Sequence, residues 1–114
     1  ADIVRADVSW KDGITGTLKI AHLAEAFGLN CEIHTTTMNY MDLVNLHVSC
    51  AIKNCEYFEY FVPEENYTLP MKGKLPIDEH GIIHVPQGPG VGAELDWDLI
   101  EKSCRSYRKL DYKG

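Results

Sequence analysis

The chain has 114 residues, of which 45% are hydrophobic, and this is enough to build one hydrophobic core of ordinary size. Its formal net charge is −6 and its 11 Lys and Arg residues are dispersed, which argues against nucleic acid or an anionic membrane as a partner, because both require clustered cations. The sequence shows neither an apolar run of about 18 residues nor a secretion-type amino-terminal segment, so we expect a cytoplasmic location.

The beginning of the chain predicts a strand followed by a helix. Residues 2–8 alternate apolar and polar side chains, and this strand is expected to end at a tight turn containing Asp12-Gly13. Thr15 is available as the cap of a helix over 17–27. Gly28 is expected to end this helix, because a left-handed residue after a helix is most easily a glycine. The apolar residues with one-face helical spacing are Ile20, Leu23, Ala24 and Phe27.

The next segments continue this alternation. Residues 29–34 predict a second strand, residues 40–53 a second helix and residues 55–61 a third strand. Short connections of this kind favour parallel pairing with right-handed crossovers. The second helix should be largely covered, because its apolar residues extend around much of its surface: Met41, Leu43, Val44, Leu46, Val48, Cys50 and Ile52.

Beyond Pro63 the pattern changes to turns and loops. Residues 76–86 predict a hairpin that turns at His80-Gly81, and the Pro- and Gly-rich residues 86–92 predict a loop. Asp96 is expected to cap a last helix that runs to about Tyr107. One face of this helix would carry Trp97, Ile100 and Cys104, and the tail beyond Arg108 is expected to fray.

Three parallel strands alone make an incomplete α/β sheet, because its outer edges have nothing to pair with. Residues 1–72 are therefore expected to form either a small doubly wound domain or the carboxyl-terminal part, with the last three strands, of a (β/α)8 TIM-type barrel whose beginning lies elsewhere. Residues 73–114 would form a closing extension made of the hairpin, the Gly/Pro loop and the last helix.

Three ionisable residues are expected at the carboxyl ends of the three strands, where active sites of parallel α/β proteins lie: Asp7, His34 and Glu59. An Asp beside a His fixes the imidazole tautomer and stabilises its charged form, which makes the His a usable base near neutral pH. Structural roles are the alternatives. His34 could bond a loop carbonyl, Asp7 could cap a turn, and Glu59 could end a solvated strand.

Two further charged residues, Arg5 and Glu32, would face the interior one step below this edge. Burying either charge costs several kcal/mol unless the two pair. We therefore expect a salt bridge between Arg5 and Glu32, with simple exposure of both as the alternative.

The four cysteines lie in apolar segments and are too few for a disulfide-stapled secreted scaffold, so we expect them to be reduced and buried: Cys31, Cys50, Cys55 and Cys104. A zinc site is a sharper alternative, because Cys31 and His34 are spaced C-x2-H and Cys50 and Cys55 are spaced C-x4-C. A strand would point Cys31 and His34 to opposite faces, which disfavours zinc.

The first 34 residues resemble part of a known enzyme family. The stretch ADIVRADVSWKDGITGTLKIAHLAEAFGLNCEIH resembles the sixth strand, sixth helix and seventh strand of the mandelate racemase subgroup of the enolase superfamily. In that subgroup an Asp ends the sixth strand, a Gly-Gly-[Ile/Val]-Thr-Gly turn follows, and the His of an Asp-His dyad ends the seventh. Asp7, the Asp12–Gly16 turn and His34 fit this pattern, with Asp12 in place of the first glycine.

The rest of the chain continues the resemblance. Glu59 resembles the family glutamate on the eighth strand that hydrogen bonds the substrate carboxylate or its enediolate, and residues 81–96 resemble the closing segment that packs on an amino-terminal capping domain. Position 7 discriminates within the family, because the muconate lactonizing subgroup carries a catalytic Lys there. Here the residue is Asp7.

The resemblance implies that His34 is the general base that removes the proton alpha to a carboxylate, and that Asp7 orients it. It also implies Mg²⁺ as the Lewis acid that holds the enediolate. The family's metal ligands and Lys-x-Lys pair belong to earlier strands, so we expect no metal ligand in this chain. Asp42 and Asp78 are no substitutes, because they fall on a helix and in a hairpin. The chain alone is then expected to be incomplete and inactive.

The expected enzyme is a hydro-lyase, an acid-sugar dehydratase that acts on a small carboxylate, with a racemase or cycloisomerase of the same subgroup as the alternative. Its partners would be the remainder of the barrel and the capping domain, and we expect the complete enzyme to be a homo-oligomer. Residues 35–40 are the one substrate-specificity loop that we expect in this chain. An alternative of another class is a noncatalytic interaction module that recruits a partner through its strand edges.

Overall fold

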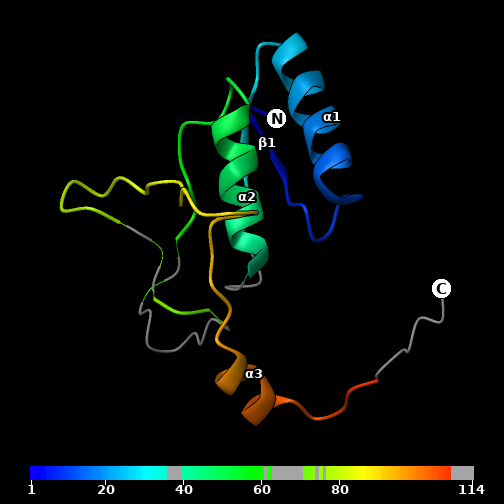
Figure 1. The fold of residues 1–114 in the computed structure, drawn as a ribbon. Helices are drawn as coiled ribbons and strands as arrows, with labels where there is room; N and C mark the ends of the chain where they lie inside the picture. Colours follow the sequence, from blue (N-terminus) through cyan, green and yellow to red (C-terminus); the bar gives the residue numbers. More distant parts are fainter. Residues whose placement is uncertain (36–39, 61, 63–70, 74, 76, 109–114) are drawn as a thin grey trace.

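The computed structural model describes residues 1–35, 40–60, 62, 71–73, 75 and 77–108. Within them the elements are β1 (Ile3–Ala6), α1 (Gly13–Ala26), β2 (Asn30–Ile33), α2 (Tyr40–Ala51) and α3 (Trp97–Ser103). β1 and β2 pair in parallel, with Ile3 opposite Asn30 and Ala6 opposite Ile33. Helices α1 and α2 lie beside these strands, and α3 lies at a distance from them (Figure 1). The strand–helix–strand order with parallel pairing is confirmed.

Helix α1 begins earlier than the sequence predicts. It starts at Gly13, so Thr15 lies inside the helix and its predicted role as a cap is wrong. The residue before the helix is Asp12, which has a left-handed backbone (φ 55°) and makes no side-chain capping bond. At the other end Gly28 has φ 68° and its amide donates to the Glu25 carbonyl, which confirms the predicted stop.

The buried face of α1 is made of small residues. Thr17, Ala21 and Ala24 are buried, whereas Leu23 and Phe27 are 62% and 74% exposed. The predicted apolar stripe is therefore wrong for its two largest members. Small side chains let α1 lie close to the strands, and this rotates Leu23 and Phe27 away from the contact.

The predicted third strand is wrong over residues 55–60, and Phe61 lies outside the described residues. This segment runs beside β2 but bonds to it largely through side chains. The Glu32 carboxylate accepts hydrogen bonds from the backbone amides of Glu56 (3.3 Å) and Tyr57 (3.0 Å). These amides are thereby satisfied without a regular backbone ladder, so the sheet of the described residues has two strands.

Helix α2 packs on two apolar clusters, which confirms that it is largely covered. The first cluster lies between the strands and both long helices: Ala6, Val8, Ala21, Ala24, Cys31, Ile33, Val48 and Ile52. The second joins α2 to the later part of the chain and contains Leu43, Leu46, Met71 and Leu75. The later segments are thus anchored on the same helix that covers the strands.

The later segments follow their predictions in reduced form. Ile77 and Ile83 make one antiparallel bridge, and Gly81 donates to the Asp78 carbonyl, so the hairpin is present but short. The Asp96 carboxylate accepts from the Leu99 amide and caps α3 as predicted. This helix ends earlier than the predicted Tyr107, and the tail from 109 on lies outside the described residues. Across the described ranges, no helix is long and apolar enough to span a membrane.

All four cysteines are free, but the prediction that all are buried is wrong. Cys31 is buried and Cys55 is half-buried, and burial raises the pKa of both thiols. Cys50 and Cys104 are exposed. Cys50 lies near the end of α2 and Cys104 directly follows α3, and neither belongs to the two clusters.

The turn before α1 requires a glycine at position 16. A Cβ there would overlap the Lys11 carbonyl oxygen and the Asp12 side chain, whereas a Cβ at Gly28 would meet nothing within 4 Å. Gly16→Ala is therefore expected to destabilise the protein by several kcal/mol, and Gly28→Ala, which suffers only from its positive φ, by about 1 kcal/mol. Urea denaturation of the two variants measures the difference, and equal losses would contradict this account of the turn.

Candidate active site

The structure brings Asp7, His34 and Glu59 to one edge of the strands. Asp7 directly follows β1, His34 directly follows β2, and Glu59 comes from the segment beside β2. The His34 Nδ1 atom lies 3.8 Å from the Asp7 carboxylate, and its Nε2 atom lies 3.8 Å from the Glu59 carboxylate. The imidazole ring therefore stands between two carboxylates. Both distances exceed a hydrogen bond and are those of ion-pair contacts.

Burial differs among the three side chains. Asp7 is 4% exposed, whereas about a third of the His34 and Glu59 side chains reaches solvent. A buried acid behind a partly exposed imidazole is the arrangement in which the ring can meet a substrate while its other nitrogen faces the acid.

Asp7 also fixes the turn that follows β1. One of its carboxylate oxygens accepts from the Ser9 amide (2.6 Å), and its carbonyl accepts from the amides of Trp10 and Lys11. The turn-capping alternative and the position beside His34 are therefore compatible, because the capping oxygen is Oδ1 and the oxygen nearest the ring is Oδ2.

Asn45 is a residue of this site that the sequence analysis missed. It lies on α2, is fully buried, and links the loops that carry Asp7 and His34. Its side-chain oxygen Oδ1 accepts from the Val8 amide (3.1 Å), and its side-chain NH2 group donates to the backbone carbonyl of His34 (3.2 Å). The His34 amide in turn donates to the Ala6 carbonyl (2.8 Å). The available signal was a polar residue among the apolar residues of the helix.

Glu59 is held by two neighbours. Its Oε2 atom accepts from the Arg5 guanidinium (2.8 Å) and from the Thr35 amide (2.9 Å), and the Thr35 hydroxyl donates to the Glu59 carbonyl (3.0 Å). Burial raises the pKa of Glu59, but the hydrogen bonds from Thr35 and Arg5 outweigh it and the pKa is lowered overall. Glu59 is thus ionised at neutral pH.

The predicted Arg5–Glu32 salt bridge is wrong. The two residues are opposite each other in the strand register, but Arg5 pairs with Glu59 instead. Glu32 is engaged by the backbone amides of Glu56 and Tyr57, which explains why it does not turn toward Arg5.

Comparison with known proteins assigns the family. Residues 1–99 match the family of enolase C-terminal domain-like proteins. The chain belongs to this family. It is 31% identical over 107 residues to an arabinonate dehydratase of Saccharolobus solfataricus. The aligned region covers 92% of this chain and 28% of that protein.

Two solved structures extend the family assignment to the fold. A Pseudovibrio protein described as a mandelate racemase/muconate lactonizing enzyme matches with a TM-score of 0.81 and 36% identity, over 92% of this chain and 28% of that one. The D-glucarate dehydratase from Agrobacterium tumefaciens, complexed with magnesium, matches with a TM-score of 0.72 and 39% identity, over 89% and 27%. The chain thus has the α/β fold of the enolase C-terminal domain and spans about a quarter of the length of these relatives.

The described residues of this enolase-superfamily chain do not fit a magnesium site. Mg²⁺ prefers an octahedral set of oxygen ligands, but Glu59 is occupied by Arg5 and Thr35, and Asp7 caps its turn. Within the ranges that the structure describes, no group of three or more His, Cys, Asp or Glu side chains could hold a metal ion, zinc included. Asp42 is buried on α2, and Asp78 lies in the hairpin, where it faces His84.

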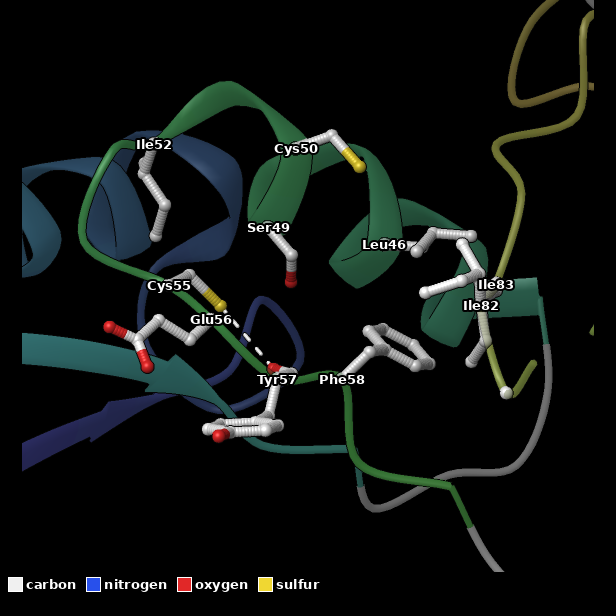
Figure 2. A pocket seen from close by; sticks show the side chains of 11 residues that line it. Leu46, Ser49, Cys50, Ile52, Cys55, Glu56, Tyr57, Phe58, Ile82 and Ile83 are labelled. Carbon is white, nitrogen blue, oxygen red and sulfur yellow. Dashed lines mark hydrogen bonds between the residues drawn. The ribbon is translucent and has the colours of Figure 1, made fainter.

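Two pockets lie near the strands. One of about 200 Å³ contains the dyad and is lined by Arg5, Ala6, Asp7, Trp10, Lys11 and His34. A larger one of about 590 Å³ lies between the end of α2, residues 55–58 and the hairpin. In Figure 2, Phe58, Leu46 and Ile83 approach one another on its apolar side, and none of the three site residues lines it. The smaller pocket is therefore the candidate active site.

Thr35 begins the predicted specificity loop but is 1% exposed and serves to hold Glu59. Residues 36–39 lie outside the described residues. The specificity role of residues 35–40 therefore stays a prediction.

Proposed function

We propose that the chain carries the general base of an acid-sugar dehydratase of the enolase superfamily. The observation that carries this proposal is the placement of the His34 ring between Asp7 and Glu59 in a pocket at the strand edge. The names of relatives, an arabinonate dehydratase and a D-glucarate dehydratase, support a sugar acid as the substrate.

The proton chemistry follows from the geometry of the ring. Asp7 faces Nδ1 and favours the tautomer with a proton on that atom, which leaves the lone pair on Nε2. Nε2 takes the proton from the carbon next to the substrate carboxylate, and the electrons of the broken C–H bond move into that carboxylate to form an enediolate. Asp7 stabilises the imidazolium that results.

Dehydration is completed by the same imidazole. The electrons of the enediolate return and break the bond between the next carbon and its hydroxyl. The hydroxyl takes the proton from His34 and leaves as water, and the remaining enol converts to a ketone. One substrate hydrogen and one hydroxyl are lost as water, and His34 returns to its neutral form. Glu59 lies on the Nε2 side of the ring, where it would contact the substrate oxygens.

The proposal assigns residues 1–72 to the last three strands of a (β/α)8 barrel and residues 73–114 to an extension that packs on a capping domain. The remainder of the barrel would provide the ligands for Mg²⁺, which would supply Lewis acidity at the substrate carboxylate. This chain alone would be inactive, and the complete enzyme would be a cytoplasmic homo-oligomer. The pairing of β1 and β2 with the buried Asp7 and the partly exposed His34 at their edge supports this assignment.

A racemase or cycloisomerase is the second candidate, and the Pseudovibrio relative favours it through its description. The same base and dyad serve both reactions. The outcomes differ, because a racemase returns the proton to the same carbon and the product keeps all its hydroxyls.

The experiment is an exchange assay with the complete enzyme in D2O. A panel of sugar acids is incubated with enzyme and Mg²⁺ and followed by NMR. We expect the alpha proton to be lost and a ketone product to appear with at least one substrate of the panel. Deuterium at the alpha carbon with all hydroxyls retained would favour the racemase, and the absence of any exchange or product would contradict the proposal.

The noncatalytic module has a simpler test. Mass spectrometry and size-exclusion chromatography of the purified protein give its mass and association state. A companion polypeptide or a large assembly supports the enzyme proposal, whereas a stable folded monomer of 12.9 kDa would favour the module.

A further inference from the structure

Lys11 is a charged residue of the candidate pocket to which the proposed chemistry gives no role. It lines the pocket of about 200 Å³ together with Asp7 and His34. Its side chain is exposed, and its ammonium group forms no hydrogen bond or ion pair with any other residue of the described ranges. An ammonium group beside the proposed proton-transfer site is thus available to a ligand.

The backbone of Lys11 is fixed, so its ammonium group has a defined reach. The Lys11 amide donates to the Asp7 carbonyl (3.1 Å), which also accepts from the Trp10 amide (3.3 Å). A Cβ at Gly16 would overlap the Lys11 carbonyl oxygen, so the first turn of α1 packs closely on this peptide. The residue that orients the proposed base therefore also holds the position of Lys11.

The other charges at the pocket already have partners. The Arg5 guanidinium is paired with the Glu59 carboxylate at 2.8 Å. The Asp7 carboxylate faces His34 Nδ1 at 3.8 Å, and the imidazolium matches its charge once His34 has taken a proton. Among the described residues that line the pocket, Lys11 is therefore the cation whose charge the protein does not match.

An unmatched cation favours an anion over a hydroxyl group. A hydrogen bond between ionised groups is roughly twice as strong as one between neutral groups, and a hydroxyl would leave the charge of Lys11 unmatched. The reacting carboxylate is not the candidate, because the proposed function assigns it to Mg²⁺ held by the remainder of the barrel. The partner of Lys11 is then a second carboxylate, at the other end of the substrate.

Trp10 gives the same pocket an apolar wall. It lines the pocket and is 72% exposed, although it is a large apolar residue. An aromatic ring packs well on C–H groups, whereas the charged ends of a ligand need polar partners. A carbon chain with a carboxylate at each end fits this combination, since its middle can contact the Trp10 ring while one end is bound by Lys11.

We propose that Lys11 is a specificity-determining residue that binds a second carboxylate of the substrate, so that the preferred sugar acids are dicarboxylates. This inference rests on the proposed function and narrows its substrate class from sugar acids in general to those with a carboxylate at each end. The sequence analysis expected a specificity determinant only in residues 35–40. Lys11 adds one in the loop between β1 and α1.

Calorimetry on the complete enzyme tests this preference without turnover. His34→Asn is the background, because it lacks the proposed base, and Mg²⁺ is present throughout. The ligands are glucarate with gluconate and galactarate with galactonate, and the members of each pair differ only in a carboxylate or a hydroxymethyl group at the far end. We expect the dicarboxylate of at least one pair to bind about tenfold more tightly. This is the lower end of the effect of a hydrogen bond to a charged group, because Lys11 is exposed.

Three variants in this background assign the preference to Lys11. Lys11→Gln is expected to abolish it, and Lys11→Arg, which keeps the charge, is expected to retain it. Lys19→Gln is the matched control, because Lys19 is an exposed cation on α1 that does not line the pocket. A preference that survives in Lys11→Gln, or no pair in which the dicarboxylate binds more tightly, would overturn the proposal. A Lys11-dependent preference for 6-phosphogluconate over glucarate would overturn it too, because the recognised group would be a phosphate.

Turnover by the enzyme with His34 intact separates this proposal from the proposed function. The ratio of kcat/KM for a dicarboxylate to that for its matched monocarboxylate should fall about tenfold in Lys11→Gln and stay unchanged in Lys19→Gln. An unchanged ratio with a lower Tm in Lys11→Gln would show that Lys11 bonds the remainder of the barrel, and it would overturn the role of Lys11 while the dehydratase stands. Absence of alpha-proton exchange with every sugar acid contradicts the proposed function instead, and the calorimetry still decides what Lys11 binds.

Discussion

Replacement of His34 by Asn in the complete enzyme is expected to abolish exchange of the alpha proton, with a loss of at least a hundredfold in rate. The reason is that Asn has no basic nitrogen, and a positioned general base contributes about a hundred- to ten-thousandfold. Asn is similar in size to the part of the ring near the backbone, so the hydrogen bonds of the His34 peptide to Ala6 and Asn45 can persist. The exchange is measured by NMR in D2O at neutral pH.

Two controls make the His34 result specific. His22 is exposed on α1 and does not line the pocket, so His22→Asn should exchange at the wild-type rate. Mg²⁺ binding by calorimetry should be unchanged in His34→Asn, because the described residues around His34 do not form a metal site. Exchange that survives in His34→Asn would remove His34 from the role of base.

The first half of the fold could be predicted because its signals are local. The alternation over residues 2–8 and the glycine at position 28 define β1 and the end of α1 through a few neighbouring residues. The placement of Asp7 and His34 follows from these boundaries, since parallel strands end at the same edge. Two residues far apart in the sequence were therefore placed together by local patterns alone.

The predictions of a third strand and of an Arg5–Glu32 salt bridge are wrong because each depends on which of several distant partners a side chain bonds. The apolar residues of 55–61 favour a strand, but the Glu32 carboxylate takes the amides that a strand would offer to its neighbour. Because Glu32 accepts from these amides, Arg5 pairs with Glu59 instead. A strand register shows which residues are opposite each other, but it does not show which of several charged partners each side chain selects.

The role of Asn45 also could not be predicted from the sequence. A polar residue in an apolar helix can point to solvent or into the core, and its position in the sequence does not distinguish the two. The structure shows that it is fully buried and bonded to two loops at once. A buried amide with partners for both its donor and its acceptor is a stabilising and specific contact.

Replacement of Asn45 by Leu is therefore expected to lower the free energy of unfolding by about 2–4 kcal/mol. Leu has the same branching of heavy atoms as Asn but larger methyl groups, so overpacking adds to the loss. The main loss would come from the Val8 amide and the His34 carbonyl, which each lose their partner on α2. An unsatisfied buried polar group costs about 1–3 kcal/mol. Urea denaturation gives the change in stability, and alpha-proton exchange below the unfolding transition gives the effect on the site.

Ser49→Ala is the matched control, because Ser49 lies one turn along α2 and its hydroxyl bonds the Asn45 carbonyl without touching either loop. Its loss should stay under about 1 kcal/mol, since the deleted bond lies within one helix and Ala favours helices. If Asn45→Leu exchanged protons slowly while folded and Ser49→Ala did not, the link from α2 to the His34 loop would be needed to hold the base in place. Wild-type stability and exchange in Asn45→Leu would show that the two loops keep their positions without it, and that the parallel strands alone align Asp7 with His34.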